Sequence, residues 1–430
     1  MINFNENNET LERLTANAIL VGASTGGDIS YSMKELRGLA EAAGAEVLGE
    51  MVQNIEKVNA ATYIGSGKIV ELGEMAENMG ADLIIFNDEL TGMQLRNIED
   101  ACHVKVIDRT ILILDIFADR ATSREGKLQV ELAQLQYRMP RLLGFGKSLS
   151  RLGGGIGTRG PGEKKLETDR RHIQRRMDEI RHEMEEVKQD RSVQRSRREK
   201  SDIPIVALVG YTNAGKSSIM NRFMDIEARE DKKVFEKDML FATLDTSQRL
   251  VTLDERTSFI LIDTVGFVSK LPHTLVNAFK ATLEEIRYAD LLLHVVDSSF
   301  DNHDFQIEVT NSVIEEVMRP RKGEEIEMPP QIMVYNKIDL APEFSPLGQN
   351  ALAISAKTGE GWDNLIATMK SALFSDYETV ELLVPYTRGD IVSYVNQKSK
   401  PLEVKYEENG TYIKVELSGA DAAKLKEFAL

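Results

Sequence analysis

The stretch Gly210-Tyr211-Thr212-Asn213-Ala214-Gly215-Lys216-Ser217 fits the phosphate-binding pattern G-x-x-x-x-G-K-[ST] and directly follows an apolar run over 203–209. Its two glycines let backbone N–H groups turn onto a triphosphate, and the next helix presents the positive end of its dipole. Lys216 can reach the outer phosphates, and the Ser217 hydroxyl can hold a magnesium ion. The stretch therefore predicts a P-loop domain of the α/β class that binds a nucleotide.

Two later motifs occur in the order that a P-loop fold requires. Asp263 and Gly266 stand in Asp263-Thr264-Val265-Gly266, after an apolar run that starts at Phe259. Such an Asp orders magnesium through water, and such a Gly offers its N–H to the γ-phosphate. A further strand, 332–335, leads into Asn336-Lys337-Ile338-Asp339.

The last motif predicts that the base is guanine. A carboxylate at Asp339 can accept two hydrogen bonds, from N1–H and the amino group of guanine, and adenine lacks that donor pair. Ser355-Ala356-Lys357 follows another strand and fits a backbone contact to the base, with Lys357 stacking on it. The predicted GTP-binding residues are Gly210, Asn213, Ala214, Gly215, Lys216, Ser217, Ser218, Asp263, Gly266, Asn336, Lys337, Asp339, Ser355, Ala356 and Lys357.

The predicted catalytic residues are Lys216, Thr243 and Gly266. Thr243 lies between the first two motifs, where a hydroxyl completes the magnesium shell only when the γ-phosphate is present, so this stretch is expected to be a switch. The predicted metal ligands are thus Ser217 and Thr243, with Asp263 acting through water. Phe267 stands where Ras-type enzymes carry a water-orienting Gln, which predicts slow hydrolysis by the isolated protein. Asn213 raises the alternative of a potassium ion beside the phosphates.

Composition excludes several classes of protein. With 430 residues the chain can form two or three domains with buried cores. No apolar run reaches membrane-spanning length, and no signal peptide is recognisable. A single cysteine, Cys102, excludes internal disulfides and suits a reducing cytoplasm. The six histidines show no metal-ligand spacing.

The charge is distributed unevenly. The whole chain has a formal net charge of −16, yet the segment 138–200 carries 18 Lys and Arg against 10 Asp and Glu. A basic segment on an acidic protein fits contact with a nucleic-acid backbone, and a solvated helix surface is the alternative.

The N-terminal stretch alternates strands and helices. The expected strands are 18–21, 45–51, 81–86 and 104–107, separated by helices at 32–42, 68–78 and 94–101. This order predicts a small parallel α/β domain. Gly65-Ser66-Gly67-Lys68 precedes one of these helices and could bind an anion, which leaves a second nucleotide site open.

Two heptad patterns then predict a long antiparallel helical hairpin. Apolar residues recur at spacings of 4, 3, 4 and 3 from Leu128 to Leu142 and at 7, 4, 3, 4 and 3 from Leu166 to Val187, on either side of the glycine-rich run 153–162. That run would form a mobile tip that probes a partner. After the nucleotide-binding stretch, 380–385, 402–407 and 411–417 read as strands and 388–395 as a helix, which predicts a small α+β module. The predicted domains are 1–120, 121–200, 201–375 and 376–430.

Five further runs stand out: Tyr63-Ile64-Gly65-Ser66-Gly67-Lys68, Asp108-Arg109-Thr110, the run 125–135, the run Gly154-Gly155-Ile156-Gly157-Thr158-Arg159-Gly160-Pro161-Gly162-Glu163, and Asp263-Thr264-Val265-Gly266-Phe267. With these runs the chain resembles, over nearly its whole length, the HflX family of ribosome-associated GTPases.

The resemblance implies a TRAFAC-like GTPase domain, Mg²⁺ as cofactor, and binding to the rRNA of the large ribosomal subunit. It also implies splitting or rescue of stalled ribosomes under stress. We expect a cytoplasmic monomer, part of which ribosomes carry to the membrane. The expected ribosome contacts are Arg151, Arg159, Lys164, Lys165, Arg170 and Arg171. Two alternatives remain: a GTP-controlled switch acting on a regulatory protein, and ATP-driven RNA remodelling by the N-terminal domain.

Overall fold

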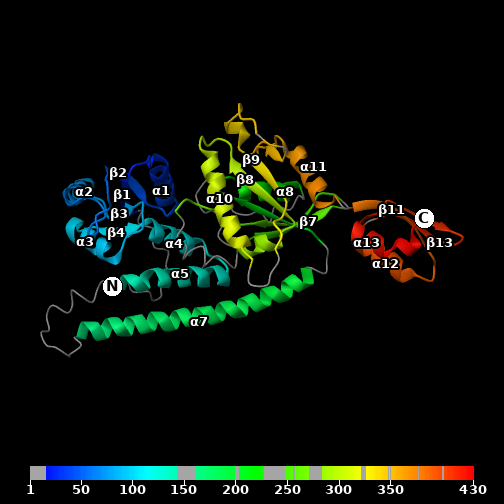
Figure 1. The fold of residues 1–430 in the computed structure, drawn as a ribbon, viewed down its shortest axis with the longest axis horizontal. Helices are drawn as coiled ribbons and strands as arrows, with labels where there is room; N and C mark the ends of the chain where they lie inside the picture. Colours follow the sequence, from blue (N-terminus) through cyan, green and yellow to red (C-terminus); the bar gives the residue numbers. More distant parts are fainter. Residues whose placement is uncertain are drawn as a thin grey trace. The chain divides into compact units, whose positions relative to one another are not determined.

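The computed structural model describes residues 16–142, 161–198, 203–226, 247–254, 257–270, 283–320, 326–346, 348, 350–375, 377–399 and 401–430. These fall into two compact units. One comprises Met1–Val187, Asp238–Leu244 and Ser269–Phe279, and the other comprises the rest of the chain. Most helices and many strands of both units are labelled in Figure 1. The finer division into four domains stays a prediction.

The N-terminal sheet confirms the predicted parallel α/β order. Its strands are β1 Asn17–Ser24, β2 Glu46–Asn54, β3 Leu83–Phe86 and β4 Lys105–Asp108. They pair in parallel in the order β2-β1-β3-β4. The connecting helices are α1 Ser30–Ala42, α2 Ser66–Met79 and α3 Gly92–Cys102, and α4 Arg109–Arg120 follows β4. Seven of the eight residues of β1 are buried, as expected for an inner strand of a parallel sheet.

Local capping sets where the helices of this unit begin. Thr91 and Gln94 form a capping box at the start of α3, in which each side chain bonds the backbone N–H of the other residue. The Asp108 carboxylate caps α4 by accepting from the Ile111 N–H at 3.0 Å. The chain therefore turns from strand to helix at the carboxyl edge of the sheet, directly after β4.

Two helices form the predicted antiparallel pair, α5 Arg124–Leu142 and α7 Pro161–Arg198 (Figure 1). Leu128 and Leu132 of α5 form one apolar cluster with Met177 and Ile180 of α7. Ion pairs fix the register. Arg124 pairs with Glu183 at 3.2 Å and Glu131 pairs with Arg176 at 2.7 Å, so partner numbers fall along α7 as they rise along α5. The glycine-rich tip, 153–160, lies outside the described residues.

The second unit contains a six-stranded sheet in the order β10-β9-β8-β5-β7-β6. All neighbours are parallel except the pair β6 and β7. Its strands are β5 Ile205–Gly210, β6 Ser247–Thr252, β7 Ser258–Asp263, β8 Leu291–Asp297, β9 Gln331–Asn336 and β10 Ala351–Ala353. Its helices are α8 Lys216–Ile226, α10 His303–Met318 and α11 Trp362–Leu373, with 3₁₀ turns η4 Glu284–Tyr288 and η5 Ile338–Leu340.

Apolar side chains from both faces of this sheet are fully buried. Phe223 of α8 packs edge-on against Phe259 of β7, with ring centroids 5.6 Å apart, and contacts Trp362 of α11 at 4.7 Å. Such central strands read as apolar runs because both faces are covered. β5, β7 and β9 all point the same way, so the three sequence motifs that follow them meet at one edge.

The C-terminal module is the predicted small α+β fold. Its strands are β11 Tyr377–Val384, β12 Glu403–Glu407 and β13 Gly410–Ser418. They form an antiparallel sheet in the order β11-β13-β12. Its helices are α12 Gly389–Lys398 and α13 Gly419–Lys424, and η6 Lys426–Phe428 follows.

Candidate functional site

The phosphate-binding loop joins β5 to α8 at the edge of the sheet where the strands end. The loop requires glycine at Gly215, where φ is +96° and an added Cβ would lie 2.1 Å from the Asn336 amide nitrogen. Asn213 is exposed and also adopts a left-handed backbone, with φ 61°. The Ala214 carbonyl accepts from Asn336 Nδ2 at 2.9 Å. The loop is therefore held by β9 as well as by the strand it follows.

Lys216 begins α8 and turns back over the loop. Its ammonium group is buried and donates to the carbonyl oxygens of Gly210 at 3.0 Å and Tyr211 at 2.8 Å. Burial lowers the pKa of Lys216 to about 8, and the nearby Asp263 carboxylate opposes that shift. The side chain is thus positioned among backbone carbonyls at the loop, where an incoming phosphate would compete for its protons.

This pKa predicts that GDP binding weakens in mild alkali. Phosphate favours the charged ammonium, so binding above pH 8 must return a proton to Lys216, whereas at pH 7 the proton is already present. We expect the GDP affinity at pH 8.6 to be about fourfold lower than at pH 7.0. Calorimetry in two buffers of different ionisation enthalpy would measure both the affinity and the proton uptake. An affinity that stays constant over this range, with no proton taken up, would contradict the prediction.

Two predicted metal-site residues lie within hydrogen-bonding distance of each other. The Ser217 hydroxyl donates to Asp263 Oδ2 at 2.8 Å, and Asp263 is fully buried at the end of β7. A hydroxyl beside a carboxylate is an oxygen set that suits Mg²⁺, which also keeps several waters. Thr243, the third predicted member, lies outside the described residues. Within the described ranges no cluster of three or more His, Cys, Asp or Glu side chains offers another metal site.

The guanine motif forms a connected set of hydrogen bonds. Ser355 Oγ donates to Asp339 Oδ1 at 2.7 Å, which orients the carboxylate predicted to read the base. Both ends of the Asn336 amide are bonded to the backbone of other loops. Its amide nitrogen bonds Ala214, and its amide oxygen accepts from the Ala356 N–H at 2.9 Å. Asn336 therefore joins the phosphate loop to the loop predicted to contact the base.

Two residues that sequence reasoning missed, Asp297 and Arg222, also shape this site. Lys337 has φ 68° and its ammonium pairs with Asp297, at the end of β8, at 2.8 Å. Arg222 of α8 donates to the Ala356 carbonyl at 3.1 Å. Asp297 follows an apolar strand as Asp263 does, and that position was a usable signal. Nothing local in the sequence marks Arg222. Lys357, the predicted stacking residue, is exposed.

Phe267 lies beside the phosphate loop and not in solvent. Its N–H donates to Gly210 O at 3.2 Å, and its carbonyl accepts from the Thr212 N–H at 2.7 Å. The ring is 2% exposed and packs in an apolar cluster that includes Val209 and Leu292. A buried aromatic ring offers no hydrogen bond to water, which supports the prediction of slow unassisted hydrolysis.

The predicted ribosome contacts fall largely outside what the structure shows. Arg151 and Arg159 lie in the segment that is not described, and the side chains of Lys164 and Lys165 are not described either. Arg170 and Arg171 are exposed on α7. Some of the local positive charge is used within the hairpin, because Arg176 and Arg181 pair with carboxylates.

The loop Gly65-Ser66-Gly67-Lys68 has its groups engaged by the protein. The Gly65 N–H, at the start of α2, donates to Gln53 Oε1 at 2.9 Å, and Lys68 pairs with Glu71 at 2.6 Å. These contacts use the groups that an anion would need, so they do not favour a second nucleotide site here.

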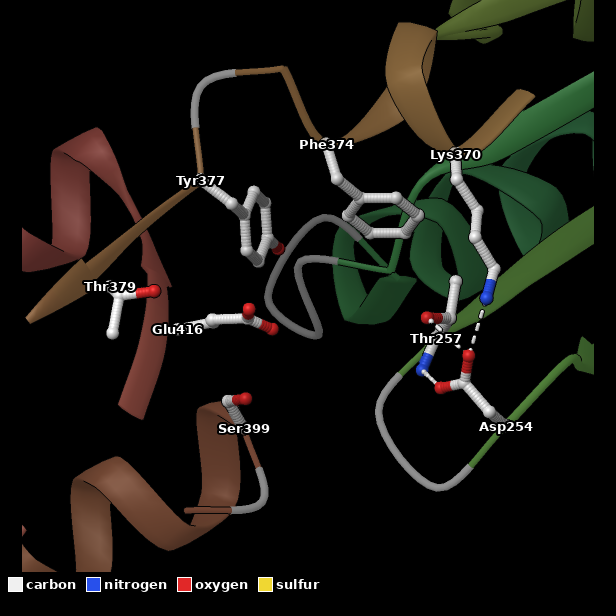
Figure 2. A pocket seen from close by; sticks show the side chains of 8 residues that line it. All are labelled: Asp254, Thr257, Lys370, Phe374, Tyr377, Thr379, Ser399 and Glu416. Carbon is white, nitrogen blue, oxygen red and sulfur yellow. Dashed lines mark hydrogen bonds and ion pairs between the residues drawn. The ribbon is translucent and has the colours of Figure 1, made fainter. Parts of the chain in front are cut away.

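A cavity of about 590 Å³ is lined by residues of the second unit (Figure 2). Lys370 and Asp254 form an ion pair of 2.5 Å on one side of it. Phe374 and Tyr377 place their rings edge to face, with centroids 5.1 Å apart. None of its lining residues belongs to a nucleotide motif, so the three strand-end motifs, and not this cavity, define the candidate site. The lining residues are Asp254, Thr257, Lys370, Phe374, Tyr377, Thr379, Ser399 and Glu416.

Three family descriptions match the chain in succession. Residues 30–118 match "GTP-binding GTPase N-terminal", 120–198 match "GTP-binding GTPase Middle Region", and 205–337 match "50S ribosome-binding GTPase". The third match covers the phosphate loop, the Asp263 motif and the start of the guanine motif.

Full-length relatives agree with these matches. The GTPase HflX of Caldanaerobacter subterraneus subsp. tengcongensis is 48% identical over 98% of this chain and 96% of its own length. The GTPase HflX of Lacrimispora saccharolytica is 44% identical over 94% of each chain. A solved GTP-binding protein from Sulfolobus solfataricus, in complex with GDP, is 23% identical, with a TM-score of 0.44 over 84% of this chain and 99% of its own.

Proposed function

Because this chain belongs to the HflX family of GTPases and hydrolyses GTP, we propose that it does so on the large ribosomal subunit, where it splits or rescues stalled ribosomes. The match of residues 205–337 to a 50S ribosome-binding GTPase is the observation that carries this proposal. The exposed Arg170 and Arg171 on α7 support it, because cations on a helical arm suit contact with an RNA backbone.

The reaction converts GTP and water to GDP and phosphate, and the proposed roles rest on the sequence motifs together with the contacts described above. Lys216 would neutralise charge on the phosphates, and the Gly266 N–H would donate to the γ-phosphate. Ser217 and Thr243 would hold Mg²⁺, with Asp263 acting through a water molecule. The metal would neutralise phosphate charge as the bond to the leaving group breaks. Asp339 would select guanine.

The large ribosomal subunit is expected to help orient the attacking water, which the side chain of Phe267 cannot do. Since the ring of Phe267 is buried and cannot orient water, the isolated protein should hydrolyse GTP slowly. We expect purified large ribosomal subunits to raise the rate by roughly tenfold or more. Phosphate release measured with and without subunits is the test. Small ribosomal subunits at the same concentration are the matched control, since they present RNA without the proposed site.

The same assay separates the alternatives. A rate that large subunits leave unchanged would sink the ribosomal proposal and favour a switch acting on a protein partner. Repeating the assay in sodium in place of potassium tests the ion proposed beside Asn213, whose side chain is exposed at the loop. Potassium is expected to give the faster rate, and Asn213→Ala should remove the difference between the two ions.

A further inference from the structure

Arg222 connects the helix after the phosphate loop to residues 355–360, the loop predicted to contact the base, which we call the base loop. It stands on α8, the helix that Lys216 begins, and its side chain is half-buried. Its Nη1 donates to the Ala356 carbonyl at 3.1 Å. Helix and loop both belong to the second unit. Arg222 lies outside the nucleotide motifs, so its role has to be inferred from the groups it holds.

A glycine in the base loop makes room for the Arg222 guanidinium. An added Cβ on Gly359, where φ is +91°, would lie 2.7 Å from Arg222 Cζ and closer still to its Nη2. The same guanidinium carbon lies 5.3 Å from the centre of the Trp362 ring, within the range of a cation–π contact. Arg222 therefore packs against the turn of the base loop as well as bonding its backbone.

The base loop leaves one of its backbone donors free. Its other N–H groups all have acceptors within the protein, at Ser355, Ala356, Thr358, Gly359 and Glu360. Among the described residues, no acceptor lies within hydrogen-bonding distance of the Lys357 N–H. A backbone N–H requires a partner, and one that the protein does not satisfy is available to a ligand. The free donor marks where this loop can bond a base.

Arg222 fixes the direction of this donor. The Ala356 carbonyl and the Lys357 N–H belong to one trans peptide unit, which is planar, so the two groups point in opposite directions. Arg222 holds the carbonyl oxygen on the side of α8, and the N–H of Lys357 therefore faces away from that helix. A charged donor on the carbonyl also polarises the peptide, which strengthens its N–H as a donor. One arginine thus sets both the direction and the strength of the free donor.

The chemistry of guanine identifies the acceptor that this donor fits. Asp339 is proposed to accept from N1–H and from the 2-amino group, which leaves O6 as the acceptor on the neighbouring ring carbon. Ser355 begins the base loop and bonds Asp339 Oδ1 at 2.7 Å, so one loop holds both the carboxylate and the free donor. Adenine carries an amino group in place of O6, and a donor would then face a donor.

We propose that Arg222 is a positioning residue for guanine recognition, which aims the Lys357 N–H at O6 of the base. The inference rests on the proposed selection of guanine by Asp339 and adds a second, separate recognition to it. Asp339 recognises N1–H and the amino group, and the base loop recognises O6. Because Arg222 acts through the Ala356 peptide and does not touch the base, its loss weakens the recognition of O6 alone.

Binding of GDP, inosine diphosphate and 6-thio-GDP to the full-length protein separates the two recognitions. Inosine diphosphate lacks only the 2-amino group, so the preference for GDP over it reports on Asp339. In 6-thio-GDP sulfur, a weaker acceptor, replaces O6, so that preference reports on the base loop. Arg222→Met keeps an unbranched stem beside Trp362 but has no donor. In this variant we expect the preference for GDP over 6-thio-GDP to fall from about tenfold to about twofold, with the preference over inosine diphosphate unchanged.

Two further variants distinguish a lost hydrogen bond from a general loss of stability. Arg222→Lys keeps one donor for the Ala356 carbonyl and should retain most of the preference over 6-thio-GDP. Arg287→Ala is the matched control, because that arginine also donates to backbone carbonyls, those of Val317 and Arg319, outside the nucleotide motifs. It should leave both preferences unchanged. A smaller folded fraction lowers all affinities by the same factor, so the ratios remain informative for a destabilised variant.

Failure of this inference and failure of the proposed guanine site give different results. An unchanged preference over 6-thio-GDP in Arg222→Met would overturn the role of Arg222, and so would the loss of both preferences together. If the natural protein bound inosine diphosphate as tightly as GDP, Asp339 would not recognise the amino group, and the proposed selection of guanine would be wrong. The change in the 6-thio-GDP preference between the natural protein and Arg222→Met would still decide the role of Arg222.

Discussion

Replacement of Lys216 with alanine is expected to lower kcat/KM for GTP by about 100- to 1000-fold. The ammonium group is buried at the phosphate loop and donates to two backbone carbonyls there. Alanine would leave those carbonyls without this donor and the phosphates without a buried positive charge. A charged donor placed where negative charge develops contributes roughly 3–4 kcal/mol to transition-state stabilisation. Phosphate release under single-turnover conditions, with large ribosomal subunits present, would measure the loss.

The control for this variant is a lysine of the same domain that has no part in the proposed chemistry. Lys337 is half-buried and pairs with Asp297, so Lys337→Ala removes an ammonium from the same domain. We expect it to weaken guanine-nucleotide binding modestly and to leave the chemical step nearly unchanged. If Lys216→Ala hydrolysed GTP at the natural rate, the proposed phosphate site would be wrong. Retention of ATPase activity in that variant would point to a separate site in the N-terminal unit.

Replacement of Asp339 with asparagine is expected to weaken GTP binding by about 100- to 1000-fold and to create binding of xanthosine triphosphate. The carboxylate would accept from two guanine donors, and each hydrogen bond to a charged group contributes about 1.5–3 kcal/mol. An amide offers one donor and one acceptor. The amide nitrogen would then face the amino group of guanine, which is also a donor. In xanthine the amide oxygen can accept from N1–H and the amide nitrogen can donate to the C2 oxygen.

Competition binding against a fluorescent nucleotide would measure both affinities for Asp339→Asn. Ser355→Ala is the matched comparison, because it removes the hydroxyl that donates to Asp339 Oδ1 and leaves the carboxylate in place. We expect that variant to lose about tenfold in GTP affinity with no gain for xanthosine triphosphate. If Asp339→Asn discriminated between the two nucleotides as the natural protein does, another residue would have to read the base.

Much of this fold could be predicted from the sequence because apolar runs mark buried parallel strands. The two parallel sheets follow from where those runs stand and from the helices between them, whereas the spatial order of the strands was not predicted. The three nucleotide motifs could be placed together because β5, β7 and β9 are parallel and end at one edge. The helical pair followed from apolar spacings, and the pairing of Arg124 with Glu183 shows its antiparallel register.

The polar links between these elements could not be predicted. A sequence pattern shows which residues are buried, but it does not show which polar side chains that lie far apart in the sequence form hydrogen bonds or ion pairs with each other. Arg109 and Ser269 stand 160 positions apart, and neither belongs to a nucleotide motif that would suggest the pairing. Lys337 was expected to bind nucleotide because it lies within the guanine motif, yet its ammonium pairs with Asp297. The length and charge of its side chain allow either outcome.

The double attachment of Asn336 bears on how the two ends of a nucleotide are sensed. One amide group bonds Ala214 in the phosphate loop and Ala356 in the base loop, so neither loop can relax without pulling on the other. When guanosine and pyrophosphate are offered as separate fragments, the binding of each should therefore raise the affinity of the protein for the other. A nucleotide that carries only one correct end would meet a pocket strained at both. The binding free energy lost by a wrong nucleotide would then exceed the sum of the losses expected at its two ends, because one side chain, Asn336, contacts both loops.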